Sequence, residues 1–191
     1  SRVQQANPVS TGRIVTVNGH DVNVLTAGSA GPTVLMIHGA SANAREFSWT
    51  LAPRLESDFR VLMADRPGHG YSQRFDGASA LGAQAAQMAG VLDQLAPGEK
   101  AVIVGHSFGG AVALRLALDR PDLVEGLVLS APVSHDWGGG GQAWYNGLAA
   151  APLVGPVFTQ LVPTVGPAQV KAGISSVFDP APVPENYFEN S

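Results

Sequence analysis

The stretch that decides the fold is VIVGHSFGGA, residues 102–111. Its first three residues are β-branched and predict a strand, whereas its last three are small and suit the first turn of a helix. Between these two parts, Gly105 and Gly109 flank Ser107 in the pattern G-x-S-x-G. Small neighbours let a helix pass close to a strand, so the pattern predicts a sharp strand-to-helix turn that exposes the Ser107 hydroxyl. A glycine-rich turn with an incidental serine is the alternative interpretation.

Strands and helices alternate on both sides of this turn. Continuous apolar runs predict buried strands, and a 4, 3, 4, 3 spacing of apolar residues from Leu81 to Leu95 predicts an amphipathic helix. Asn43 and Glu46 resemble a capping box that opens a helix ending near Leu55. The other expected elements are strands at residues 13–17, 22–27, 33–38, 59–65, 100–105 and 123–131 and a helix at residues 108–120. This order predicts an α/β fold with a doubly wound, mainly parallel sheet.

Local signals add detail to this outline. Asn18 and Gly19 lie between the first two strands and tolerate positive φ, so they predict a hairpin. We expect Met88 in the core of its helix and Trp49 packed beneath the first helix.

Three segments are expected: an N-terminal arm at residues 1–12, an α/β core at 13–132 and a region at 133–191 that lies over the sheet. The last segment is apolar, begins near the glycine run 138–141 and is interrupted by several prolines. Its aromatic residues Trp137, Trp144 and Tyr145 are candidates for lining a substrate pocket. Packing against the core explains them equally well.

Composition excludes several classes of protein. The 191 residues are 45% hydrophobic and 14% charged, which is too apolar for a disordered chain. The net charge is −4 without a basic cluster, so neither nucleic acid nor an anionic membrane is an expected partner. There is no cysteine, and no His/Asp/Glu cluster has ligand spacing, so we expect no metal and no cofactor. A soluble protein is expected, either cytoplasmic or exported with a leader removed.

The candidate chemistry centres on Ser107. A serine on such a turn can attack a carbonyl, and backbone N–H groups must then stabilise the oxyanion. We assign these donors to Phe108, which follows the serine, and to Ala40, which follows the strand 33–38. Losing one such donor typically costs about 3–4 kcal/mol of transition-state stabilisation. A plain glycine turn at residues 38–40 is the alternative.

A further loop, DRPGHGYS at residues 65–72, follows the strand 59–65. A nucleophilic Asp65 and a phosphate-binding loop are possible chemical interpretations. Pro67 and the two glycines are typical turn residues and favour a structural loop instead.

Together these three motifs resemble the α/β-hydrolase superfamily, over about residues 12–132. They look most like the branch that holds epoxide hydrolases, haloalkane dehalogenases, C–C bond hydrolases, perhydrolases and small esterases. Epoxide hydrolases and haloalkane dehalogenases usually carry Asp at the position of Ser107 in this turn, so the serine favours serine chemistry. The resemblance implies that residues 133–191 form a helical cap that shapes the pocket.

The catalytic acid and histidine that the resemblance implies have no clear place in the chain. The family order is Ser, acid, His, and among the five histidines only His135 follows Ser107 at any distance. His135 and its neighbour Asp136 lie too early, and a polar turn is the favoured interpretation there. We therefore expect the N-terminal part of a longer enzyme, with its C-terminal remainder as a second chain packed on the first. A sheet that stopped at residues 123–131 would expose an apolar edge.

The expected function is a serine hydrolase that cleaves a small apolar carboxylic ester through an acyl-enzyme. A C–C bond hydrolase, lactonase, amidase or perhydrolase would use the same residues. A different class, a ligand-binding pseudoenzyme without a base, also stays open. A histidine beside the Ser107 hydroxyl would distinguish it from the enzymes.

Overall fold

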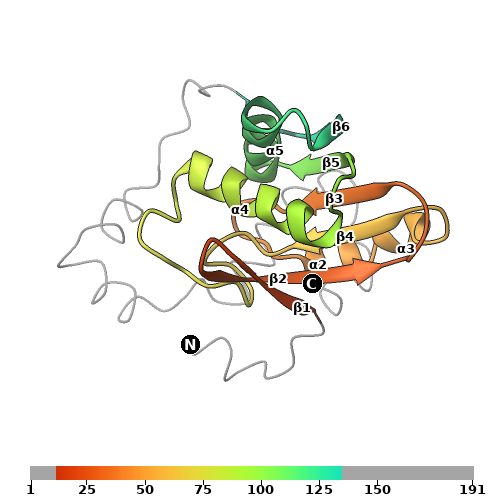
Figure 1. The fold of residues 1–191 in the computed structure, drawn as a ribbon, viewed down its shortest axis with the longest axis horizontal. Coiled ribbons are helices and arrows are strands. Elements are labelled where there is room, and N and C mark those ends of the chain that lie inside the picture. The colour runs from red at the N-terminus through yellow and green to blue at the C-terminus, as the bar shows by residue number, and fades with distance from the viewer. Residues whose placement is uncertain (1–11, 135–191) are drawn as a thin grey trace, which may run out of the picture. The chain divides into compact units, whose positions relative to one another are not determined.

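Residues 12–134 are the part of the chain that the computed structural model describes, and they fall within one compact unit. Within them, six strands form one sheet in the order β1-β2-β4-β3-β5-β6 (Figure 1). Residues 1–11 and 135–191 lie outside the described part, and with them His135, Asp136, Trp137, Trp144 and Tyr145. The proposed arm and cap are therefore not tested.

The hairpin forms as predicted. Strands β1 (Arg13–Val17) and β2 (His20–Ala27) pair antiparallel, with Val17 opposite His20. The two residues of the turn have positive φ, 51° at Asn18 and 79° at Gly19. This geometry matches the twist of the two strands, which is why Asn-Gly is favoured there.

The centre of the sheet is parallel, as the apolar runs indicate. Strand β3 (Thr33–Ile37) pairs parallel with both β4 (Arg60–Ala64) and β5 (Ala101–His106), and β6 (Val124–Ser130) pairs parallel with β5. Side chains alternate between two cores because the strand period is two. Leu35 and Ile37 of β3 belong to one core, and Val34 and Met36 belong to the other.

Helices cover both faces of the sheet. The long helices α4 (Leu81–Leu95) and α5 (Phe108–Asp119) pack on one face, next to each other (Figure 1). Met88 of α4 is fully buried there, as predicted. The short helices α2 (Arg45–Ser48) and α3 (Ala52–Leu55) pack against the opposite face. This arrangement confirms the doubly wound α/β fold.

The predicted helix from Asn43 to Leu55 is wrong in one respect, because it consists of two short helices. Pro53 lies in the first turn of α3, where it has no N–H to continue a helix from α2. The Asn43 side chain does accept the Arg45 N–H at 2.9 Å, but Glu46 does not complete a capping box. Its carboxylate accepts the N–H of Gly39 instead, at 3.0 Å.

The expectation for Trp49 is also wrong. Trp49 follows the last residue of α2 and is 61% exposed. Phe47, two residues earlier, is the buried aromatic residue of α2. The short helix presents only a narrow face to the sheet, so Phe47 occupies the position that the sequence suggested for Trp49.

Candidate active site

Ser107 occupies a strained turn between β5 and α5. Its backbone has φ 51° and ψ −119°, a conformation that L-residues other than glycine adopt only under constraint. Three backbone hydrogen bonds of 3.0 Å supply the constraint: Ser107 N–H donates to Ser130 O, and Ser107 O accepts from the N–H groups of Gly110 and Val133. Such strain costs about 1–3 kcal/mol and is typical of functional turns.

Glycines make this turn possible by letting α5 approach the strands. A Cβ on Gly105 would lie 2.6 Å from the carbonyl oxygen of Gly109, and a Cβ on Gly110 would lie 2.6 Å from the Cβ of Pro132. A Cβ on Gly109 would collide with the backbone oxygen of Ile37 in β3. The small residues of the motif thus have the packing role that the sequence predicts.

The turn after β3 lies directly against Ser107. A Cβ built on Gly39 would lie 3.4 Å from the Cβ of Ser107. The structure therefore brings residues 38–40 and the start of α5 together at the carboxyl edge of the sheet. No hydrogen bond outside the regular helix and strand ladders of residues 12–134 uses the N–H of Ala40 or of Phe108.

His38 is fully buried and serves as a fixed part of this turn. Its Nδ1 faces the carbonyl oxygen of Gly39 at 2.9 Å, and its Nε2 accepts the backbone N–H of Arg66 at 3.0 Å. The neutral tautomer protonated at Nδ1 satisfies both contacts. Burial, and then the charge of Arg66, lower the pKa of His38 to about 3, so the ring is neutral at ordinary pH.

Arg66 is the site residue that the sequence interpretation missed. Its guanidinium donates from Nε to His38 O at 3.0 Å, and from Nη2 to Gly39 O at 2.7 Å and Ala40 O at 3.3 Å. The side chain is only 2% exposed. Burial lowers the pKa of Arg66 to about 10, so its charge persists at neutral pH. The sequence places it in a turn loop and gives no signal of these contacts.

The other end of Arg66 contacts the next helix and the residue after the nucleophile. Nη1 donates to Gln84 Oε1 of α4 at 2.7 Å. The guanidinium carbon lies 5.0 Å from the centre of the Phe108 ring, within the range of a cation–π contact. Arg66 thus touches both segments that carry the predicted oxyanion donors.

His106 lies beside the Gly39 turn, where a Cβ on Gly39 would be 3.3 Å from its Nδ1. It contacts the Glu46 carboxylate, which also accepts the N–H of Gly39. The sequence predicts that His106 flanks the nucleophile without acting as its base, and its partner on α2 agrees with that. Among the described residues, Ser107 has no side-chain hydrogen bond to a histidine or a carboxylate.

Asp65 anchors the loop at residues 65–72, in agreement with the turn residues that favour a structural loop there. The buried Asp65 carboxylate accepts the N–H of Ala44 at 2.7 Å, the side-chain amide of Asn23 at 2.9 Å and the N–H of Tyr71 at 2.9 Å. Its oxygens thus bind three donors from other parts of the fold, which favours the structural interpretation of Asp65 over a nucleophilic one.

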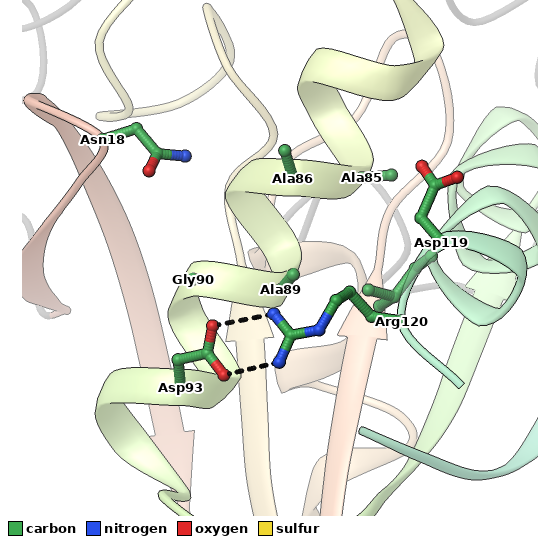
Figure 2. Close-up of a pocket in the computed structure, with 9 residues that line it drawn as sticks. Asn18, Ala85, Ala86, Ala89, Gly90, Asp93, Asp119 and Arg120 are labelled. Carbon is green, nitrogen blue, oxygen red and sulfur yellow. Dashed lines mark hydrogen bonds and ion pairs between the residues drawn. The ribbon is translucent and has the colours of Figure 1, made fainter. Parts of the chain in front are cut away.

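The pocket of Figure 2 lies elsewhere. It has a volume of about 340 Å³ and lies between the first hairpin, α4 and the end of α5, and Figure 2 shows Arg120 paired with Asp93 at its rim. Arg120 follows the C-terminal end of α5, whereas Ser107 precedes its N-terminal end. The helix is 12 residues long, so about 18 Å separates the two ends. This pocket is not part of the candidate site.

Residues 12–134 contain no group of three or more metal-binding side chains. No helix of this part is long and apolar enough to cross a membrane.

Comparison with known proteins identifies the family. Residues 32–161 match the alpha/beta hydrolase fold family, so the chain belongs to it. The chain is 35% identical over 142 residues to the magnesium-chelatase 30 kDa subunit of Rhodobacter capsulatus. The aligned region covers 72% of this chain and 49% of that protein. It is 39% identical over 109 residues to an esterase of Mycobacterium tuberculosis, which covers 56% of this chain and 35% of that protein.

Solved structures agree with this assignment. A meta-cleavage product hydrolase superposes with a TM-score of 0.61 at 30% identity, over 66% of this chain and 47% of that one. The chain spans half or less of the length of these relatives. Their family supports a hydrolase in general and includes several reaction types.

Proposed function

We propose that this chain carries the nucleophile of a serine hydrolase that cleaves a small apolar carboxylic ester through an acyl-enzyme. The observation that carries the proposal is the strained Ser107 beside the Gly39 turn, where a Cβ on Gly39 would lie 3.4 Å from the Cβ of the serine. In acyl transfer, a strained turn exposes the serine hydroxyl, and two backbone N–H donors beside it stabilise the oxyanion. The similarity to an esterase supports the ester as substrate class.

In this mechanism the Ser107 hydroxyl attacks the ester carbonyl and gives its proton to a general base. The carbonyl electrons move to oxygen, where the N–H groups of Ala40 and Phe108 stabilise the oxyanion. The tetrahedral intermediate collapses, the base returns the proton to the leaving alcohol, and the acyl-enzyme remains. Water then attacks the acyl-enzyme with the same base and releases the acid.

We also propose that the histidine base and its acid come from a part of the protein other than residues 12–134, as a second chain or a further segment. The described histidines support this, because His38 and His106 are occupied elsewhere. Strand β6 supports it too, since Val128 at the edge of the described sheet is 52% exposed. A partner for this edge would complete the fold as well as the site.

A C–C bond hydrolase is the second candidate function. The 30% identity and structural similarity to a meta-cleavage product hydrolase favour it. The same serine and the same donors would serve, and the shape of the pocket would select the substrate.

Steady-state kinetics on a panel of short-chain aryl esters and dienoate diketones tests both candidates, with the full-length protein that contains this chain. Ser107→Ala is expected to lower kcat by about 10⁶-fold, the loss typical of a triad that acts as a unit. Ser57→Ala is the matched control, because Ser57 bonds only its exposed neighbour Asp58. Activity of Ser107→Ala close to wild type would refute both candidates, and preference between the two substrate classes separates them.

A further inference from the structure

The turn at residues 38–40 is held by a buried positive charge that has no carboxylate in direct contact, although the charge of Glu46 acts on it from farther away. Arg66 donates to three neutral backbone carbonyls and to the neutral amide of Gln84, and its Nη2 also lies 3.3 Å from His69 Nε2. No carboxylate of residues 12–134 lies within ion-pair distance of Arg66. Burying a charge without a paired opposite charge is expensive. A loop that only needed to be fixed in place could use neutral donors at lower cost.

The contact to Gly39 has a direct consequence for the next residue. The carbonyl of Gly39 and the N–H of Ala40 belong to the same peptide group, which is planar and trans. The two bonds therefore point in opposite directions. When Arg66 and His38 both hold Gly39 O, at 2.7 and 2.9 Å, the direction of the Ala40 N–H is set as well.

The same contact also strengthens the donor. A charged donor on a carbonyl polarises its peptide group, and hydrogen bonds along such a chain reinforce one another. The Ala40 N–H therefore becomes a better donor toward an anion on its other side. Glu46 holds the preceding N–H, that of Gly39, at 3.0 Å, and His69 Nε2 faces Ala40 O at 2.9 Å. These contacts leave the Ala40 N–H as the unused group of the turn.

Arg66 also reaches the second donor segment. Its guanidinium lies over the Phe108 ring, and Phe108 follows Ser107 at the start of α5. The cation thus holds the side chain of the residue whose own N–H is the other predicted donor. One residue from the loop after β4 connects the turn after β3 with the turn after β5.

We propose that Arg66 is a positioning residue that orients and polarises the Gly39–Ala40 peptide as an oxyanion donor. Through its contact with the Phe108 ring, it also fixes the position of this peptide relative to the second donor segment. The inference rests on the proposed serine hydrolase function. Arg66 does not touch the reacting atoms in this account, and it acts through the peptide group. Gln84 has a supporting part, because it anchors the far side of the guanidinium on α4.

Arg66→Lys tests the inference in the full-length protein. Lysine keeps the charge, but its single ammonium group cannot span three carbonyls and Gln84. We expect kcat to fall about 10–100-fold with little change in KM, because an oxyanion donor acts in the transition state and not on the bound substrate. Arg60→Lys is the matched control. Arg60 bonds Thr33 and Glu99 at the opposite end of β4, so its kcat should equal that of wild type.

Gln84→Met is a second variant that leaves Arg66 in place and removes its anchor on α4, together with the 3.4 Å hydrogen bond from Gln84 Nε2 to Ser79 O. It is expected to lower kcat by a smaller factor, again with KM unchanged. If Arg66→Lys does not fold, this variant tests the inference in its place. A folded Arg66→Lys with the kcat of wild type would overturn the inference, as would an unchanged kcat in Gln84→Met when Arg66→Lys is unfolded. Ser107→Ala, measured in parallel, distinguishes a failure of the Arg66 inference from a failure of the proposed function. If Ser107→Ala stays active, the proposed function itself has failed.

Discussion

Gly39 and Ser107 are neighbours at the ends of two adjacent strands: a Cβ on Gly39 would lie 3.4 Å from the Cβ of the serine. The two residues are 68 positions apart, and each follows the carboxyl end of its strand, β3 and β5, which pair in parallel register. The parallel sheet thus places the turn with the Ala40 N–H, for which residues 12–134 provide no acceptor, beside the strained serine. This relationship underlies the proposed chemistry.

Gly39→Ala tests that contact. The added methyl group would lie 3.3 Å from His106 Nδ1, closer than most side-chain contacts, and 3.4 Å from the Ser107 Cβ, so the His106 ring or the turn beside the serine must move by a few tenths of an ångström. We expect kcat to fall about tenfold while the fold is retained, since small misplacements of reacting groups slow catalysis. Gly126→Ala on β6, where a Cβ meets no atom within 4 Å, is the control. A wild-type kcat in Gly39→Ala would show that the turn does not contribute to the reaction.

Gly109→Ala should destabilise the protein strongly. Its methyl group would collide with backbone oxygens at the end of β3, which cannot rotate away as a side chain can. We expect a loss of about 2–3 kcal/mol in the free energy of unfolding, measured by urea denaturation. Gly82→Ala in α4 is the matched change, because its nearest neighbour is Arg115 at 3.7 Å. It should instead stabilise the helix by about 0.5–1 kcal/mol, and equal effects of the two changes would contradict the packing described here.

His38 predicts a specific dependence of stability on pH. Its pKa is about 3 in the folded protein and about 6.5 in its ordinary state. Between these values the unfolded chain binds a proton that the folded chain does not, so stability falls as the pH is lowered through this window. The slope from this one group reaches about 1.4 kcal/mol per pH unit and vanishes above pH 7.

The variant His38→Asn isolates this contribution. Asparagine can still donate to Gly39 O, but it does not titrate. Urea denaturation between pH 7 and 4.5 should therefore show a flatter decline of stability for the variant than for wild type. Parallel declines would mean that His38 is not held neutral by its burial.

Asp93→Asn tests whether the pocket of Figure 2 takes part in the reaction. Asp93 holds Arg120 with two contacts of 3.0 and 3.1 Å at the rim of that pocket. We expect kcat/KM on the ester substrate to be unchanged and the melting temperature to fall only slightly, because exposed ion pairs contribute little. A loss of activity like that of Ser107→Ala would move the site to this pocket.

The fold was predictable where a residue acts through its neighbours in sequence. Asn18 and Gly19 predict the hairpin because both tolerate positive φ. The turn at Ser107 is predictable because the close approach of helix and strand requires glycines on both sides of the serine. The continuous apolar runs predict the parallel sheet because strands whose two faces are both covered by helices are apolar on both faces.

The rest depends on contacts between distant residues. Arg66 bonds the carbonyls of residues 38–40, and a backbone carbonyl looks the same in every sequence, so no pattern could reveal this contact. Glu46 has the spacing of a capping box, but the Gly39 N–H and His106 compete successfully for its carboxylate. In both cases, residues that are distant in the sequence determine which groups the side chain binds.

The most direct test of the central claim is the mass of the full-length protein after treatment with a fluorophosphonate, followed by peptide mapping. The account predicts a single adduct on Ser107, which is absent in Ser107→Ala and present in Ser57→Ala. A folded protein that forms no adduct, or forms it on another serine, would contradict the assignment of Ser107 as an activated nucleophile.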